Sequence, residues 1–312
     1  MDKIILTDLD AKEYEHPLDK AALEKLESIP GIRPLVEKIW EKFLDKLFYF
    51  ESTGSRIEIN EENYFDLYQI YLEACKILDF QKIPPLYLEN SPLINAFAHG
   101  VDRPYIAITY GAIERLEKEE LLFILAHELG HIKSQHVLYS DVAFKFKNIV
   151  EIASQMSLGI AGLVGRGFEV ALMYWYRMSE FTSDRAGLLA CQDSKVAIRT
   201  IIKMSGLPVH KTNVESFEKS FLKQAEDFEQ FDYGAMNKLI RFWSTADRTH
   251  PWSVLRASEL LRWEESDDYK SILKRELMPT LDEISSNSKF CAQCGSRLEE
   301  SQKYCGICGT KA

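Results

Sequence analysis

Residues 121–136, LLFILAHELGHIKSQH, constrain this chain more than any other stretch of its sequence. The stretch is mostly apolar, yet it carries His127, Glu128 and His131 in its middle. The spacing of its apolar residues predicts a helix over about residues 117–137. A buried imidazole or carboxylate is costly unless a partner satisfies it. Because helix residues four apart lie on one face, both histidines are within reach of one ion.

These three residues form the pattern HExxH, in which a zinc ion binds both imidazoles and the glutamate acts as general base. The alternative is a pair of core histidines satisfied by hydrogen bonds. A longer pattern, HExxHxxGxxH, needs glycine at 134 and histidine at 137, where this chain has Ser134 and Val137. That longer pattern is therefore excluded. We interpret His136 as a solvated or hydrogen-bonded residue at the helix end.

A catalytic zinc needs a third protein ligand and an open position for water. A second helical segment, RMSEFTSDRAG at 177–187, supplies Glu180 and Asp184 four residues apart on one helix face. Glu180 can bind the ion while Asp184 accepts the ring N–H of a ligating histidine and fixes its tautomer. The alternative is a solvated helix face. The sequence thus predicts a metal site with His127, His131 and Glu180 as ligands.

The composition limits the class of protein. Of 312 residues, 46% are hydrophobic and 28% charged, which is ordinary for a globular protein with one large core and a small accessory module. The net charge of -10 disfavours nucleic-acid binding, because it repels phosphate backbones. The acidic first thirty residues do not resemble a secretory signal, so we expect a cytoplasmic protein.

The pattern of elements predicts a mainly α protein with a small antiparallel sheet, an α+β fold. Residues 18–80 have helical spacing, and residues 84–111 contain short runs typical of two or three antiparallel strands. A helical stretch over 210–283 is interrupted near the sequence THPW. The polar run DEISSNS is typical of a linker. We therefore expect a domain over 1–283, a linker over 284–288 and a small module over 289–312.

Together, HELGH, the later RxxExxxD, NAF at 95–97 and THP at 249–251 resemble the HtpX-like zinc metalloendopeptidases, which include the CAAX prenyl endopeptidases. The resemblance covers about residues 18–265. It implies a gluzincin core, in which His127, His131 and Glu180 bind a catalytic zinc ion and Glu128 is the base. It further implies supporting roles for Arg177 and Asp184.

The resemblance also implies an edge strand beside the cleft, formed by Asn95, Ala96 and Phe97, where an extended substrate pairs with the backbone. We assign no ligand role to His99, which follows this motif. For the oxyanion of the tetrahedral intermediate the candidate is His250, because similar family members carry a histidine there. A histidine before proline is also often structural, and Arg256 is a competitor for this role.

These residues predict a zinc metalloendopeptidase that acts on proteins or peptides. Protein quality control is one process in which such an enzyme could act. Zinc lowers the pKa of a bound water from 15.7 to about 7, and Glu128 takes the proton and passes it to the leaving amine. The alternative is an inactive, scaffold-like relative whose C-terminal module binds a protein partner. An intact base beside a complete ligand set argues against that alternative.

Many members of this family are membrane proteins, but no segment here is predicted to span a bilayer. The apolar stretch at 149–176 carries charges, and its uncharged run is shorter than the ~20 residues that a spanning helix needs. Its glycines and the aromatic residues Tyr174, Trp175 and Tyr176 would suit a hairpin that covers the cleft or touches the inner face of a membrane. Peripheral membrane contact is therefore left open.

The C-terminal tail holds two CxxC pairs, each followed by glycine and separated from each other by ten residues, with cysteines at Cys291, Cys294, Cys305 and Cys308. Four thiolates at this spacing predict a structural zinc ion in a zinc ribbon. A segment this short cannot bury enough core to fold alone, so the metal would supply its folding free energy. The alternative is a tail of free or disulfide-paired cysteines. We expect one catalytic and one structural zinc ion, and a protein partner or substrate at the ribbon.

Overall fold

The computed structural model describes residues 3–143, 145, 166–206, 214–230, 252–275, 289–290 and 297–298. It divides into two compact units, Met1–Leu273 and Lys274–Ala312. The predicted linker at 284–288 lies outside the described residues, so its bounds stay a prediction. In the second unit, strand β5 (Lys289–Phe290) pairs with β6 (Arg297–Leu298) in an antiparallel ladder.

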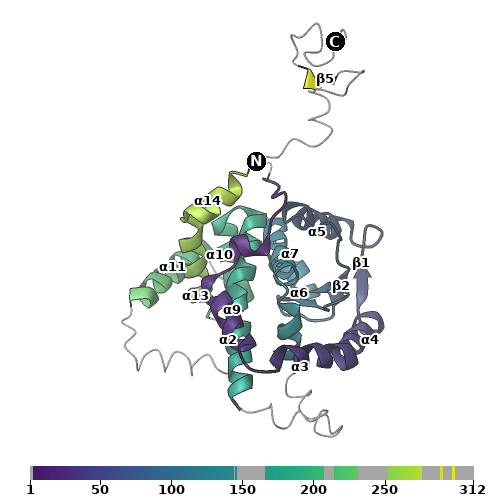
Figure 1. Cartoon of the computed structure of the whole chain (residues 1–312). Coiled ribbons are helices and arrows are strands. Elements are labelled where there is room, and N and C mark those ends of the chain that lie inside the picture. The colour runs from purple at the N-terminus through teal and green to yellow at the C-terminus, as the bar shows by residue number, and fades with distance from the viewer. Residues whose placement is uncertain are drawn as a thin grey trace. The chain divides into compact units, whose positions relative to one another are not determined.

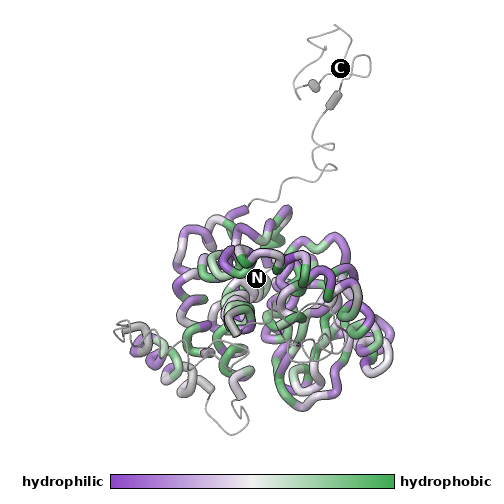
Figure 2. Tube along the Cα trace, turned by 60° about the horizontal axis from the view of Figure 1, so that its bottom comes forward, coloured by the Kyte–Doolittle hydropathy of each residue, from purple (hydrophilic) through white to green (hydrophobic). Residues whose placement is uncertain are grey.

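The first unit is mainly helical, as predicted (Figure 1). In Figure 2 hydrophobic and hydrophilic residues alternate along its helices, as expected for amphipathic helices that cover a core. The helices are α1 (Ala11–Tyr14), α2 (Pro17–Glu27), α3 (Ile32–Ile39), the π-helical segment η1 (Trp40–Leu44), α4 (Asp45–Ser55), α5 (Phe65–Ile77), α6 (Tyr110–Arg115), α7 (Lys118–Lys133), α9 (Arg166–Cys191), α10 (Ser194–Met204), α11 (Val214–Gln230), α13 (Ser253–Glu264) and α14 (Asp267–Leu273).

A four-stranded sheet of order β1-β2-β4-β3 packs against α7. Its strands are β1 (Ile57–Ile59), β2 (Leu86–Glu89), β3 (Ala96–His99) and β4 (Tyr105–Thr109). The prediction of a purely antiparallel sheet is wrong, because β2 and β4 are parallel, while the β1–β2 and β3–β4 pairs are antiparallel.

The parallel pair follows from where the β3–β4 hairpin places its second strand. The chain leaves β2, forms β3 at the sheet edge, and returns as the fully buried β4 between them. Gly100 permits the reversal, since it adopts φ +88° and a Cβ there would lie 2.4 Å from the Arg103 carbonyl oxygen. A prediction that pairs each strand with the next strand in the sequence cannot find a strand inserted between two earlier ones.

Helix α7 packs directly against α9, and two glycines allow the close approach. A Cβ at Gly130 would lie 2.6 Å from the Cβ of Ala186, and one at Gly187 would lie 2.7 Å from Cε2 of Phe123. A capping box at Glu117 and Glu120 fixes where α7 begins. The close approach therefore sets the distance between the side chains that α7 and α9 present to each other.

We expect Gly130→Ala to lower the free energy of unfolding by roughly 1–3 kcal/mol, because the added methyl overpacks the contact between α7 and α9. Gly54→Ala is the matched control, since nothing lies within 4 Å of a Cβ at Gly54 in α4. There we expect no loss, since alanine also restricts the unfolded chain. Urea unfolding of both variants measures the difference. Equal stabilities would show that the helices do not need this approach.

Within the part of the chain that the structure describes, no helix has both the length and the apolar character to cross a bilayer. The predicted membrane-contacting stretch at 149–176 is described only from residue 166 onward. There, Trp175 is fully buried against the rings of His136 and Tyr139 and is not available to a membrane. Any contact through 149–165 stays a prediction, because those residues lie outside the described ones.

Candidate metal centre

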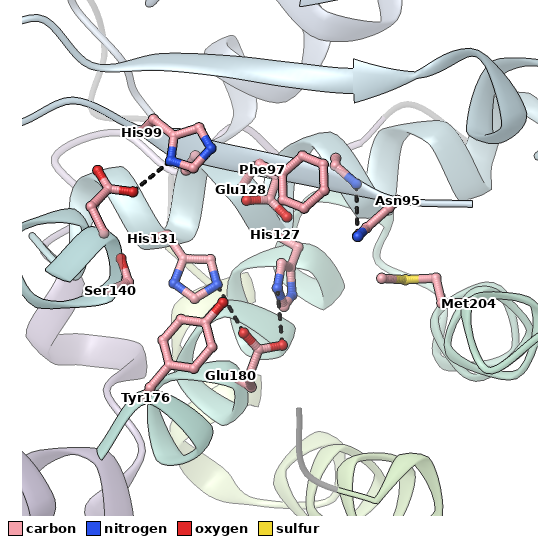
Figure 3. Close-up of a pocket in the computed structure, with 13 residues that line it drawn as sticks. Asn95, Phe97, His99, His127, Glu128, His131, Ser140, Tyr176, Glu180 and Met204 are labelled. Carbon is pink, nitrogen blue, oxygen red and sulfur yellow. Dashed lines mark hydrogen bonds and ion pairs between the residues drawn. The ribbon is translucent and has the colours of Figure 1, made fainter. Parts of the chain in front are cut away.

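Helices α7 and α9 bring His127, His131 and Glu180 together in the first unit (Figure 3). All three side chains are buried, and one ligand atom from each lies within 4.8 Å of the other two. Nε2 of His127 lies 3.7 Å from Oε2 of Glu180, and Nε2 of His131 lies 3.4 Å from Oε1. Two imidazole nitrogens and one carboxylate therefore converge as the sequence predicts.

The chemistry of this group fits a divalent metal ion. Burial lowers the pKa of His131 to about 4, so the ring is neutral at neutral pH, as a metal ligand must be. Burial opposes protonation of His127, but the Asp184 hydrogen bond and the charge of Glu180 raise its pKa overall. The same negative charges favour a bound cation. Two histidines and one glutamate form a donor set found in catalytic zinc sites.

Asp184 and Arg256 lie behind His127 and hold its ring. Nδ1 of His127 lies 3.1 Å from Oδ1 of Asp184, which leaves Nε2 for the metal. Arg256 of α13 donates to both oxygens of Asp184, through Nε at 2.7 Å and Nη2 at 2.6 Å. Burial works against ionisation of Asp184, but Arg256 keeps its pKa below the ordinary value. Asp184 is therefore an anion that orients His127.

Arg256 also places Nη1 3.5 Å from Oε2 of Glu180. It does not belong to the described lining of the pocket, and its three nitrogens face Asp184 and Glu180. This geometry favours a role for Arg256 in orienting the candidate ligands. It argues against the contact with the oxyanion, for which the sequence offers Arg256 as the alternative to His250.

A pocket opens in front of the metal group, between α7 and the edge strand β3 (Figure 3). Glu128 lines it, one residue after the ligand His127, and Glu180 closes it from α9. Asn95, Ala96 and Phe97 line the opposite side. The structure thus brings the predicted edge strand beside the predicted base and ligands.

Sequence reasoning missed two groups of this pocket. Tyr176 lines it, and burial together with the charges of Glu180 and Glu128 raises its pKa well above 10, so its hydroxyl keeps its proton. Its position one helical turn before Glu180 was the signal that would have placed it there. His99 also lines the pocket, with Nδ1 2.5 Å from Oδ1 of Asp141. No spacing in the sequence links that pair.

Of the two alternatives for His136, the hydrogen-bonded one is correct. Its side chain is buried, Nδ1 lies 3.1 Å from Nδ1 of His131, and Nε2 lies 3.0 Å from Oδ2 of Asp19. It lies just past the end of α7, where the chain turns at Gln135 with φ +57°. This turn, which the helical spacing does not predict, directs the ring back toward His131.

Other predicted site residues are not tested. His250 and the four ribbon cysteines lie outside the described residues, so their roles stay predictions. Arg177 is buried in α9, where burial lowers its pKa, and it does not line the described pocket. Its predicted supporting role also stays a prediction. Cys75 and Cys191 are buried free thiols.

A buried group of two histidines and a glutamate that could hold a metal ion, beside a second glutamate in a pocket, is the arrangement expected of a metallopeptidase. Residues 66–264 match Peptidase family M48, and the chain belongs to this family. HtpX-named proteins are among its relatives, as the sequence motifs predicted.

Two relatives show the extent of the similarity. The chain is 32% identical over 277 residues to "Plastoglobule-localized metallopeptidase 48, chloroplastic" of Arabidopsis thaliana, covering 87% of this chain and 78% of the plant protein. It is 27% identical over 173 residues to "Protease HtpX homolog" of Helicobacter pylori, covering 48% of this chain and 55% of that protein. The chain thus spans about half the length of the bacterial relative. Because the plant relative is named for a chloroplast location, the expected cytoplasmic location stays a prediction.

Proposed function

We propose that the protein is a zinc-dependent endopeptidase that cleaves unstructured segments of proteins. The observation that carries this proposal is the convergence of His127, His131 and Glu180 in a pocket that also contains Glu128. A scaffold without activity has no need for a buried carboxylate beside a buried metal-binding group, because such a carboxylate is costly to keep.

The chain's own residues divide the chemical work. A zinc ion bound here would polarise the scissile carbonyl and lower the pKa of a water molecule to about 7. Glu128 accepts the proton of the attacking water and returns it to the leaving amine, so one carboxylate serves as base and then as acid. Asp184 keeps His127 in the tautomer that binds through Nε2. His250, proposed from the family resemblance, contacts the developing oxyanion.

The sheet supplies the substrate-binding surface of this proposal. β3 lies at one end of the strand order, so it has β4 on one side and no strand on the other within the described sheet. An extended peptide pairs with such an edge through main-chain hydrogen bonds. Phe97 lines the pocket (Figure 3), and in this proposal it contacts the side chains of the substrate.

For the C-terminal unit we propose a zinc ribbon held by Cys291, Cys294, Cys305 and Cys308. The short β5–β6 ladder supports this proposal, because in the sequence its two paired strands flank the first pair of cysteines, Cys291 and Cys294. Its role is to recruit a protein partner or substrate. We also propose that the enzyme acts in protein quality control and that it contacts a membrane peripherally.

One experiment tests both metal sites. We expect the purified chain to hold about two zinc ions and to cleave a labelled, unstructured casein, with cleavage lost on chelation and restored by zinc. His127→Ala should lose one zinc ion and all cleavage. Cys291→Ser, the matched control, should lose the other ion and keep cleavage of casein. Cleavage that survives His127→Ala would refute the proposed catalytic site.

A further inference from the structure

A chain of hydrogen bonds leads from the metal group to helix α2, and the proposed mechanism does not use it. His131 directs Nε2 to Glu180, so its other ring nitrogen, Nδ1, faces away from the ligand group. A metal-binding histidine donates this second N–H to a partner that fixes its tautomer and raises its basicity. For His127 that partner is Asp184, whereas for His131 it is Nδ1 of His136, at 3.1 Å.

The geometry fixes the direction of each hydrogen bond. When His131 binds a metal through Nε2, its proton lies on Nδ1, so Nδ1 of His136 must accept it. The proton of a neutral His136 then lies on Nε2, which is 3.0 Å from Oδ2 of Asp19. Each ring therefore donates in the same sense, from His131 to His136 and from His136 to Asp19.

Asp19 is a buried carboxylate, and only one of its two oxygens has hydrogen-bond partners among the described residues. Its Oδ2 also accepts from Oγ1 of Thr182 at 2.6 Å, but Oδ1 has no hydrogen-bond partner among the described protein groups. An unsatisfied buried oxygen costs free energy, and a neutral group that accepts from His136 would cost less to bury than a carboxylate. The position in the first turn of α2 favours an anion, because the helix dipole is positive there.

We infer that Asp19, acting through His136, is a positioning residue of the metal centre. Its negative charge holds the proton of His136 on Nε2, which leaves Nδ1 as the acceptor for His131 and strengthens that ligand. Asp19 lies outside residues 66–264, so a residue beyond the matched family region supports the site. The inference rests on the metal site of the proposed function.

The test measures zinc affinity in the full chain by competition with a chromophoric chelator. The His127→Ala chain supplies the background from any other zinc site. We expect Asp19→Asn, which keeps the shape and removes the charge, to weaken zinc binding 10–100-fold. The cobalt-loaded variant should also show a shifted visible absorption, because the ligand field of His131 changes.

Two control variants separate this role from a structural one. Thr182→Val removes the other hydrogen bond of Asp19, and Glu259→Gln weakens the contact of Glu259 with His16, the N-cap residue of α2, at 3.2 Å. Neither substitution removes a hydrogen bond between His131, His136 and Asp19, and both leave the charge of Asp19 in place, although Thr182 contacts the same oxygen of Asp19 as His136 does. We expect both to change zinc affinity by less than about threefold, within what a small loss of stability produces.

Each outcome decides the inference. Equal weakening in Asp19→Asn and in both controls would mean that Asp19 only docks α2, and would overturn it. If Asp19→Asn does not fold, His136→Gln replaces it: glutamine still accepts from His131 but does not pass on the charge of Asp19, so unchanged affinity refutes the inference. If the unmodified chain binds no more zinc than His127→Ala, the proposed function itself fails and the inference fails with it.

Discussion

Glu128→Gln should reduce the cleavage rate of an unstructured protein by roughly 10²–10⁴-fold, the usual contribution of a general acid–base group. Glutamine has the same shape but cannot take a proton from water. Because Glu128 is not one of the three convergent ligands, zinc content and the free energy of unfolding should not fall. Measurement of kcat and zinc content on the same preparation separates loss of the base from loss of the metal.

Glu119→Gln is the matched control for this substitution. Glu119 lies in the first turn of α7, its side chain is 41% exposed, and it pairs with Lys3, whose side chain is 16% exposed. We expect the activity of this variant to stay within twofold of the unmodified chain, since Glu119 does not line the described pocket. Rapid hydrolysis by Glu128→Gln with a normal zinc content would remove Glu128 from the mechanism.

Arg256→Met should lower the free energy of unfolding of the metal-free protein by about 3–5 kcal/mol. Arg256 is buried, and it donates at 2.6 and 2.7 Å to Asp184, which is also buried. Removal of the guanidinium leaves the carboxylate as an uncompensated buried charge. The Arg256 charge also lowers the pKa of Asp184, so the variant should hold the His127 ring less firmly. Urea unfolding after chelation measures the loss of stability without a contribution from bound metal.

Arg262→Met on the same helix is the control. The Arg262 side chain is 58% exposed and lies 2.9 Å from Glu259 three residues earlier, so its loss should cost at most ~1 kcal/mol. Similar losses of stability in the two variants would show that the contact between Arg256 and Asp184 is not the buried ion pair described above.

The convergence of the three candidate metal ligands was predictable because their spacing is local. His127 and His131 share a face of one helix, and Glu180 and Asp184 share a face of another, so two helical periods were sufficient to propose which side chains converge. Because α7 is mostly apolar, it was expected to be buried, and its polar groups then needed a partner to offset the cost of burial. The structure brings the three ligand atoms within 4.8 Å of one another, which agrees with that proposal.

The features that the sequence did not predict depend on contacts between distant segments. The parallel pairing of β2 with β4 depends on a hairpin that inserts its second strand, and no local pattern encodes that insertion. The carboxylate partner of His136 is Asp19, from helix α2 near the start of the first unit's sequence. Tyr176 could have been predicted from the sequence, because it lies one helical turn before Glu180. It was instead grouped with its aromatic neighbours Tyr174 and Trp175 and interpreted as part of a membrane-contacting segment.

In the function proposed above, the edge of β3 that has no neighbouring strand in the described sheet gives this peptidase a criterion for what it cuts. A polypeptide can lie along that edge only if its own amide groups are not already engaged in a native fold, so well-folded neighbours are spared whatever their sequence. Discrimination then rests on the conformational state of the target more than on its side chains. On this proposal, damage or incomplete folding frees a few consecutive peptide groups and so turns a neighbouring protein into a substrate.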